Sequence, residues 1–326
     1  MTISNFLPFS PPLQAIKADF LTQKNIELWI KREDLIHPEL NGNKWRKLKY
    51  NLLEAKEQDK KSLLTFGGAF SNHLFATAAA GKLFDFDTVG IVRGERADAL
   101  SPTLRYAEKS GMQLHFVSRS EYREFTTDYQ SKKITQLFGN QHYILPEGGT
   151  NSLALKGCEE IVTDLSHDTS NPLTHYCVSV GTGGTAAGLV AALRGKAKVL
   201  GFSALKGNFL GSEIKKIFAT CDIHSYSNWT INDDYHFGGY AKFQPELITF
   251  INDFKRQFDI PLDPVYTGKM LFGIFDLIKN NYFERGSRIV AIHTGGLQGI
   301  EGYNSRHFDP KIEFDASDPP TKKVNF

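Results

Sequence analysis

The stretch Val-Ser-Val-Gly-Thr-Gly-Gly-Thr-Ala-Ala-Gly, residues 178–188, decides the fold class of this chain. An apolar run that begins at Tyr176 leads into it, and an alanine-rich segment with helical character follows from about Thr185. A buried strand, a glycine turn and a helix, in this order, form the repeating unit of a parallel sheet. The stretch therefore predicts an α/β fold.

The same alternation of short apolar strands and helices extends through most of the chain. It predicts strands at 26–31, 63–67, 88–93, 113–117, 176–180, 198–202 and 288–293, and helices that begin near residues 44, 72, 101 and 185. With 326 residues the chain is longer than a typical domain of about 150 residues, so we expect two domains that share a cleft. Residues 208–237 fit neither pattern, and the tail after Phe308 is expected to be irregular.

Charge and cysteine content exclude several classes of protein. The net charge is +2, from 38 basic and 36 acidic residues, which predicts no strong field for nucleic acid or a membrane surface. Three widely spaced cysteines fit a reducing compartment better than a disulfide framework or a zinc site. The first twelve residues lack the features of a signal peptide, and no apolar run approaches the ~20 residues that span a bilayer. We therefore expect a cytoplasmic enzyme without a bound metal.

The motif Asn-Gly-Asn-Lys-Trp-Arg-Lys, residues 41–47, places Lys44 directly after a turn. The turn puts Lys44 at the start of a helix that continues through Leu48. A lysine near a helix N-terminus, partly removed from water, has a lowered pKa and can form a Schiff base. A single lysine is more often a surface charge, and Arg46 and Lys47 are expected to be solvated.

A second motif, residues 66–73, is interpreted as a strand, a tight turn and a helix start. Ser71 or Asn72 is a good N-cap residue for that helix. The same geometry leaves free backbone N–H groups that bind a carboxylate, and Asn72 adds an amide donor. His73 has no partner at the spacing of metal ligands. The capping and binding interpretations both stay open for this motif alone.

The Gly/Thr loop from Gly181 to Thr185 can bind a phosphate through its backbone amides, with a helix dipole behind them. A nucleotide-binding P-loop is excluded because no Gly-Lys-Ser/Thr follows. A dinucleotide-binding loop is disfavoured because this loop does not follow the first strand and no acidic residue ends the strand 198–202. A plain tight turn remains the alternative.

Two further motifs, residues 263–269 (Asp-Pro-Val-Tyr-Thr-Gly-Lys) and 292–296 (Ile-His-Thr-Gly-Gly), complete an ordered set that extends from Lys31 to Gly296. The set resembles the pyridoxal-phosphate family that contains D-cysteine desulfhydrase and 1-aminocyclopropane-1-carboxylate (ACC) deaminase, within the tryptophan-synthase-β-like fold. The resemblance implies two open, twisted, mostly parallel sheets flanked by helices, with the active site between two domains. It also implies pyridoxal 5'-phosphate as cofactor and a homodimer.

The resemblance assigns the domains and the cofactor positions. Residues 1–47 and 150–326 would form the larger cofactor-binding domain, and residues 48–149 a smaller inserted α/β domain. Lys44 would form the Schiff base and take the proton from the substrate Cα. The other cofactor-binding positions would be Asn72 at the phenolic oxygen, Gly181, Thr182, Gly183, Gly184 and Thr185 at the phosphate, and Thr294 at the pyridine nitrogen.

The remaining matched positions would contact the substrate. Ser71, Asn72 and His73 would hold its carboxylate, with Ser71 counted among the catalytic residues. Tyr266 and Tyr240 would be catalytic tyrosines near the substrate side chain.

At positions 267 and 294 the threonines of this chain are similar to the pattern of the desulfhydrase branch. The resemblance places Thr267 at the substrate. The deaminases have a glutamate after the tyrosine, which keeps the pyridine nitrogen protonated and the ring a strong electron sink. A neutral hydroxyl leaves a weaker sink, which suffices when thiolate leaves from Cβ. We therefore expect elimination from D-cysteine, or a related β-substituted D-amino acid, to pyruvate, ammonia and sulfide. ACC deamination to 2-oxobutyrate and ammonia is the alternative, and a non-catalytic amino-acid-binding protein is the third possibility.

This chain departs from the family pattern beside the expected cofactor. Phe70 stands where the family commonly has glutamine, Asn41 where it has glycine, and Trp45 where it has a smaller residue. Phe70 and Trp45 either reshape the side-chain pocket or pack in the core.

Overall fold

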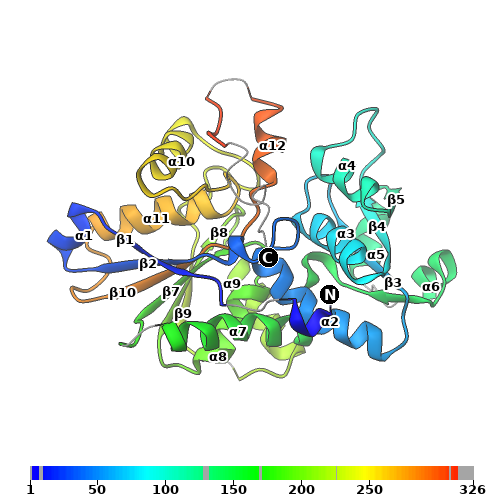
Figure 1. Ribbon diagram of the computed structural model, residues 1–326, viewed down its shortest axis with the longest axis horizontal. Helices are drawn as coiled ribbons and strands as arrows, with labels where there is room; N and C mark the ends of the chain where they lie inside the picture. The colour runs from blue at the N-terminus through cyan, green and yellow to red at the C-terminus, as the bar shows by residue number, and fades with distance from the viewer. Residues whose placement is uncertain are drawn as a thin grey trace.

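The computed structural model describes residues 2–6, 10–127, 132–168, 171–224, 226–307 and 310–314. Of the predicted irregular tail after Phe308, only residues 310–314 are described, and they form no helix or strand. Two separate β-sheets, one on each side of the molecule, organise the fold (Figure 1). The larger sheet has the strand order β1-β2-β10-β7-β8-β9 and the smaller β5-β4-β3-β6. Every pair of neighbouring strands is parallel except β1 with β2. The predicted fold of two mostly parallel sheets is confirmed.

The strands of the larger sheet come from both ends of the chain, and those of the smaller sheet from its middle. The larger sheet contains β1 (Leu13–Ile16), β2 (Glu27–Lys31), β7 (His175–Val180), β8 (Lys198–Ser203), β9 (Trp229–Asn232) and β10 (Arg288–Ile292). The smaller sheet contains β3 (Ser62–Gly67), β4 (Asp87–Arg93), β5 (Met112–Val117) and β6 (His142–Ile144).

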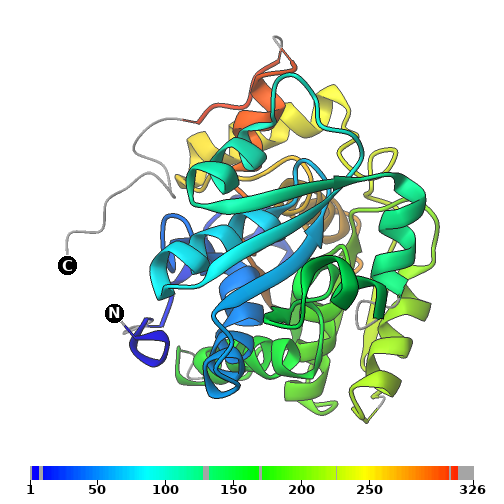
Figure 2. The ribbon, with the colours of Figure 1, turned by 90° about the vertical axis from the view of Figure 1, so that its right-hand side faces the viewer.

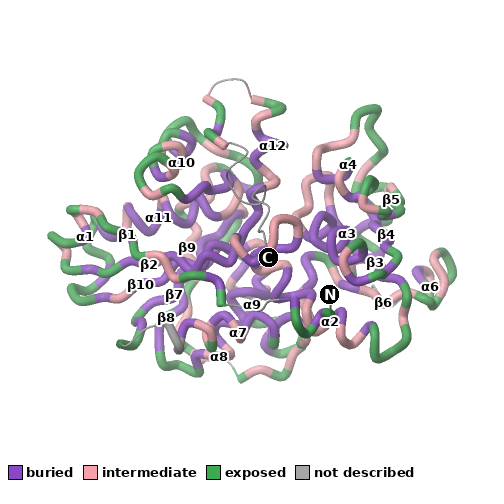
Figure 3. Tube along the Cα trace, in the orientation of Figure 1, coloured by how far each residue is buried: buried purple, intermediate pink, exposed green. Residues whose placement is uncertain are grey.

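Helices cover both faces of the larger sheet. Along β10, Ile289 and Ala291 enter one hydrophobic core, while Val290 and Ile292 enter the other, as the two-residue period of a strand requires. The first core includes side chains of α1 (Asp19–Lys24), α10 (Pro245–Phe258), α11 (Thr267–Lys279) and α12 (Gly299–Asn304). The second includes side chains of α7 (Ser152–Asp168), α8 (Gly184–Leu193) and α9 (Leu210–Thr220). Figure 3 shows the purple of buried residues concentrated in these strands and on the inner helix faces.

The smaller sheet is covered in the same way. One core joins α2 (Gly42–Glu57) and α3 (Asn72–Phe84) to β3, and another packs α4 (Pro102–Lys109) on α3 and β4. A third core involves α5 (Arg119–Thr127) and α6 (Lys132–Phe138) on the opposite face. Figure 2 views this side of the molecule, with β3 and β4 between the helices.

The sequence patterns did not predict two local features of the fold. Residues 208–237, which had no assignment, form α9 and the short edge strand β9. The antiparallel strand β1 is four residues long and only partly buried. Among the described residues, no helix is both long and apolar enough to cross a membrane.

Candidate functional site

A cavity of about 480 Å³ lies between the two sheets. The loops after β3, β7 and β10 line it, because the carboxyl ends of parallel strands meet at one edge of each sheet. Its volume falls in the range of about 300–1,000 Å³ that is typical of ligand sites. All but one of the predicted site residues line it: Lys44, Ser71, Asn72, His73, Gly181, Thr182, Gly183, Gly184, Thr185, Tyr240, Tyr266 and Thr294.

Lys44 lies in the first turn of α2, and its Nζ is 3.5 Å from the carbonyl oxygen of Gly148. Burial, followed by the neighbouring ammonium of Lys47, lowers the pKa of Lys44 to about 7. A large fraction of the amine is therefore uncharged at neutral pH, as attack on an aldehyde requires.

The start of α2 is locked against the turn after β10. Gly42 has a φ of +62°, and a Cβ there would come within 2.0 Å of the carbonyl oxygen of Thr294. Glycine is therefore required at this position by both backbone conformation and space. The close packing fixes Lys44 relative to Thr294, which lines the same cavity.

Lys47 lies one helical turn after Lys44, with its Nζ directed at the Gly/Thr loop. It donates to Thr150 Oγ1 at 3.0 Å, Gly148 O at 3.1 Å and Thr182 Oγ1 at 3.4 Å. The side chain is buried, and that burial lowers its pKa. The expectation that Lys47 is solvated is therefore wrong. The spacing of three residues between Lys44 and Lys47 puts both side chains on one face of the helix, and this spacing could have indicated that Lys47 is buried with Lys44.

The Gly/Thr loop between β7 and α8 is shaped for an anion. A Cβ at Gly184 would come within 2.6 Å of Thr150 Oγ1 and 3.0 Å of Lys47 Nζ, so glycine keeps the loop close to the lysine. Asn43 Nδ2 donates to Thr185 Oγ1 at 2.9 Å. The ten-residue helix α8 adds the positive end of its dipole. Loop amides, a helix N-terminus and a buried ammonium together fit a phosphate group.

The N-terminus of α3 forms another wall. Ser71 Oγ accepts from the backbone N–H groups of His73 and Leu74, both at 3.3 Å, so Ser71 is the N-cap. Asn72 Oδ1 accepts from Gln298 Nε2 at 2.9 Å, which ties α3 to the segment after β10. These contacts combine the capping interpretation with a position on the cavity wall.

His73 is buried beside the two lysines. Neither ring nitrogen has a hydrogen-bond partner within the described part of the chain. Burial, followed by the charges of Lys44 and Lys47, holds the pKa of His73 well below its ordinary value. The ring is therefore neutral at physiological pH and has one donor and one acceptor nitrogen for a ligand. Ser179, also buried on the cavity wall, is a second unpartnered polar group that the motifs did not indicate.

Tyr266 and Tyr240 face each other, with ring centroids 6.2 Å apart. Burial, followed by the neighbouring Tyr240, raises the pKa of Tyr266 well above its ordinary value. Tyr240 is 45% exposed, and partial desolvation beside the cavity raises its pKa. Both hydroxyls therefore keep their protons at neutral pH and can serve as donors at this end of the cavity.

Thr267 is the predicted site residue that the structure does not bring to the cavity wall. It is buried at the first position of α11, where its Oγ1 donates to Asp263 Oδ1 at 2.7 Å. Asp263 also accepts from the backbone N–H groups of Val265, Tyr266 and Thr267. Direct contact of Thr267 with the substrate is therefore corrected to a role in fixing the turn that carries Tyr266.

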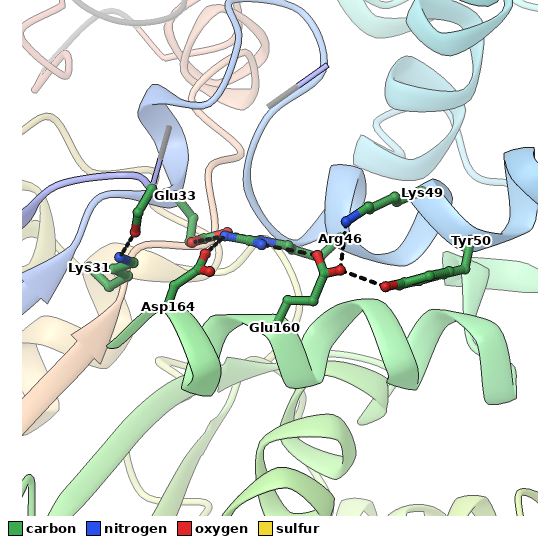
Figure 4. A network of polar contacts seen from close by, with 8 residues as sticks. Lys31, Glu33, Arg46, Lys49, Tyr50, Glu160 and Asp164 are labelled. Atoms are coloured by element: carbon green, nitrogen blue, oxygen red, sulfur yellow. Dashed lines mark hydrogen bonds and ion pairs between the residues drawn. The ribbon is translucent and has the colours of Figure 1, made fainter. Parts of the chain in front are cut away.

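An ion-pair network links α2 to Glu33 and to α7 (Figure 4). Arg46 donates to Glu33 through Nε at 2.7 Å and Nη2 at 2.9 Å, and pairs with Asp164 at 2.6 Å. Glu160 links Arg46 to Lys49 and Tyr50. The expectation that Arg46 is solvated is wrong, because this face of α2 packs on α7 and Arg46 is 1% exposed. The departure Trp45 is fully buried beside Phe6 and Phe84, which agrees with core packing.

Lys269 was also missed, because its motif gave no sign that its side chain reaches another loop. Its buried Nζ donates to the carbonyl oxygens of His236 and Gly239, both at 2.8 Å. Burial lowers its pKa to about 8. The loop that it holds contains Phe237 and Ala241 in the left-handed region and presents Tyr240 to the cavity.

We expect Lys269→Met to release this loop and reduce kcat about tenfold, because Tyr240 loses its position. The visible absorption of the bound cofactor should stay unchanged, because Lys269 does not line the cavity. Lys279→Met, at an exposed site on the same helix, is the matched control. Equal kcat in both variants would show that the position of Tyr240 does not depend on Lys269.

A buried lysine of lowered pKa, a loop that fits a phosphate group and a cavity between the two sheets fit an enzyme that uses a phosphorylated cofactor. The chain belongs to the pyridoxal-phosphate dependent enzyme family, whose profile matches residues 10–295. Its cofactor is pyridoxal phosphate, and the buried lysine pair and Gly/Thr loop fit that group. The family recognised from the five motifs is confirmed.

The relatives include both expected branches. The chain is 29% identical to the bifunctional D-cysteine desulfhydrase/1-aminocyclopropane-1-carboxylate deaminase, mitochondrial, of Arabidopsis thaliana, over 84% of this chain and 73% of that one. It is 25% identical to D-cysteine desulfhydrase of Klebsiella pneumoniae, over 85% and 89%. Among solved structures, an ACC deaminase homologue aligns with a TM-score of 0.79 at 26% identity, over 92% of this chain and 94% of the other.

Proposed function

We propose that this chain is a lyase that eliminates sulfide from D-cysteine, or the substituent from a related β-substituted D-amino acid, to give pyruvate and ammonia. The observation that carries this proposal is the hydroxyl of Thr294 on the cavity wall, on the side of the larger sheet. Glu147 is the one carboxylate among the described lining residues, and it belongs to the opposite side, where Tyr122 donates to it at 2.7 Å. A neutral partner for the pyridine nitrogen favours a substrate with a good leaving group.

The bound cofactor supplies an electron sink for the bond that breaks at the substrate Cα. The Lys44 amine, uncharged in a large fraction at neutral pH, can accept the Cα proton. The substrate carboxylate fits the N-terminus of α3, where Asn72 and the neutral ring of His73 add donors. These three groups hold the amino acid with its Cα toward Lys44.

Tyr266 and Tyr240 then face the substrate side chain. Their raised pKa values keep the protons on the hydroxyls. A tyrosine hydroxyl placed next to the departing sulfur can donate a hydrogen bond to it. With one water consumed, D-cysteine gives pyruvate, ammonia and hydrogen sulfide.

A comparison of two substrates tests the proposal. We expect the loaded enzyme to form sulfide and pyruvate from D-cysteine at least about tenfold faster than 2-oxobutyrate from ACC, since the weaker electron sink favours a good leaving group. Product formation at equal substrate concentration measures the ratio. Faster turnover of ACC would place the chain with the deaminases, and turnover of neither, with the cofactor bound, would reject both activities.

We further propose a cytoplasmic homodimer, as the family resemblance implies, with a small amino acid as its ligand and neither nucleic acid nor membrane as a partner. We also propose residues 1–47 and 150–326 as the cofactor-binding domain and 48–149 as the inserted one. The continuous helix α2 crosses the boundary at residue 47, so the division there is one of packing and not of secondary structure.

A further inference from the structure

A second cavity, of about 370 Å³, lies beside the cofactor cavity. It belongs to the side of the smaller sheet, between the end of β4 and α5. Two of its lining residues, Arg93 and Glu147, also line the cofactor cavity, so the two cavities share part of a wall. The residues that line the second cavity are Arg93, Arg119, Tyr122, Arg123, Thr126 and Glu147.

Guanidinium groups outnumber carboxylates in this wall by three to one. The carboxylate of Glu147 already accepts from Tyr122 Oη at 2.7 Å. The Arg93 guanidinium lies 5.4 Å from the centre of the Tyr122 ring, which orients it. Within the described part of the chain, no ion pair joins Arg93, Arg119 or Arg123 to a carboxylate. The cavity wall therefore carries more positive than negative charge, and its three arginines are exposed.

Arg93 lines both the second cavity and the cofactor cavity. It is the last residue of β4, whose Val92 pairs with Gly67 at the end of β3. The loop after β3 leads directly to the carboxylate site at α3, and a Cβ on Gly68 would lie 3.5 Å from Arg93 Nη2. Arg93 and Glu147 also act electrostatically on Tyr240, across the cleft. A substrate side chain directed at the tyrosines therefore comes near Arg93.

We propose that the preferred substrate carries an anionic oxygen group at the end of its side chain, bound by Arg93, Arg119 and Arg123. The proposal rests on the proposed function, since it takes the substrate to be an amino acid whose Cα faces Lys44. Planar guanidinium groups bind carboxylate and phosphate oxygens through paired, charge-assisted hydrogen bonds. D-cysteine, which lacks such a group, would then be a minimal substrate.

O-phospho-D-serine is a probe with these properties. In its elimination, Lys44 takes the Cα proton, the Cβ–O bond breaks, and its electron pair leaves with the phosphate. The remaining three-carbon unit and one water give pyruvate and ammonia. No oxidant or reductant is required.

The test compares kcat/KM for O-phospho-D-serine with kcat/KM for D-cysteine. In the double variant Arg119→Gln/Arg123→Gln we expect this ratio to fall about tenfold or more, because two charge-assisted contacts to the phosphate are lost. Arg93 is kept because it also lines the cofactor cavity. Arg96→Gln/Lys109→Gln removes the same charge from exposed positions of the same side that line neither cavity, and should leave the ratio unchanged. An unchanged ratio in the Arg119/Arg123 variant, or a wild-type enzyme that turns over D-cysteine but not O-phospho-D-serine, overturns the proposal.

A binding measurement separates this proposal from the proposed function. D-2-amino-3-phosphonopropanoate has a C–P bond that resists elimination, so calorimetric titration of the loaded enzyme reports affinity without turnover. We expect its Kd to rise about tenfold in the Arg119/Arg123 variant and to stay constant in the Arg96/Lys109 control. If no amino acid is turned over, the proposed function fails while this titration still decides the anion site. Equal Kd values in the two double variants overturn the anion site.

Discussion

Lys44→Ala is expected to abolish the visible absorption of the bound cofactor and to reduce turnover of D-cysteine by at least about 10³-fold. The substitution removes both the proposed covalent attachment point and the proposed base at the substrate Cα. Absorption spectra of the purified wild-type and variant proteins, followed by pyruvate assays, measure the two effects.

Lys56→Ala is the matched control, because Lys56 is an exposed lysine of the same helix, away from the cavity. It should keep both the spectrum and the activity. An unaltered spectrum in Lys44→Ala would mean that another amine holds the cofactor, and Lys47 would be the first to examine because its Nζ lies in the same wall.

Tyr266→Phe is expected to lower kcat by about 10²-fold while cofactor absorption and thermal stability change little. The substitution removes one hydroxyl and keeps the ring that packs against Tyr240. Tyr303→Phe removes a hydroxyl that donates to Pro310 O, outside the cavity, and should leave kcat unchanged. Loss of the cofactor together with kcat in Tyr266→Phe would indicate a structural tyrosine.

The sequence was informative about the fold wherever a strand is buried on both faces. β7 and β8 appear as short apolar runs because helices cover both sides of the larger sheet, and their ends were predicted to within one residue. β9 escaped prediction because an edge strand with partly exposed residues has no apolar run. The pairing partner of β1 depends on contacts distant in sequence, which local patterns do not contain.

Residues of the candidate site were predicted where they stand in short motifs. They were missed where their burial depends on which face of a helix packs against another helix. Lys44 and Asn72 stand in recognisable turns. Lys47 and Arg46 follow within the same motif, yet their burial depends on α7, more than a hundred residues later. Thr267 was predicted to contact the substrate, but its hydroxyl donates a hydrogen bond to Asp263, four residues earlier.

Helix α2 contacts both halves of the molecule, and this affects which parts of the site can move. Arg46 ties its first turns to Glu33 and to Asp164 of α7, on the side of the larger sheet, while Leu48 and Leu52 pack with the smaller sheet. The proposed carboxylate site at α3 and the arginines of the second cavity belong to the smaller sheet. If that sheet swings outward to admit an amino acid, Lys44 and the Gly/Thr loop keep their geometry, while the groups at α3 and in the second cavity move with the smaller sheet. Substrate exchange can then proceed many times without release of the cofactor.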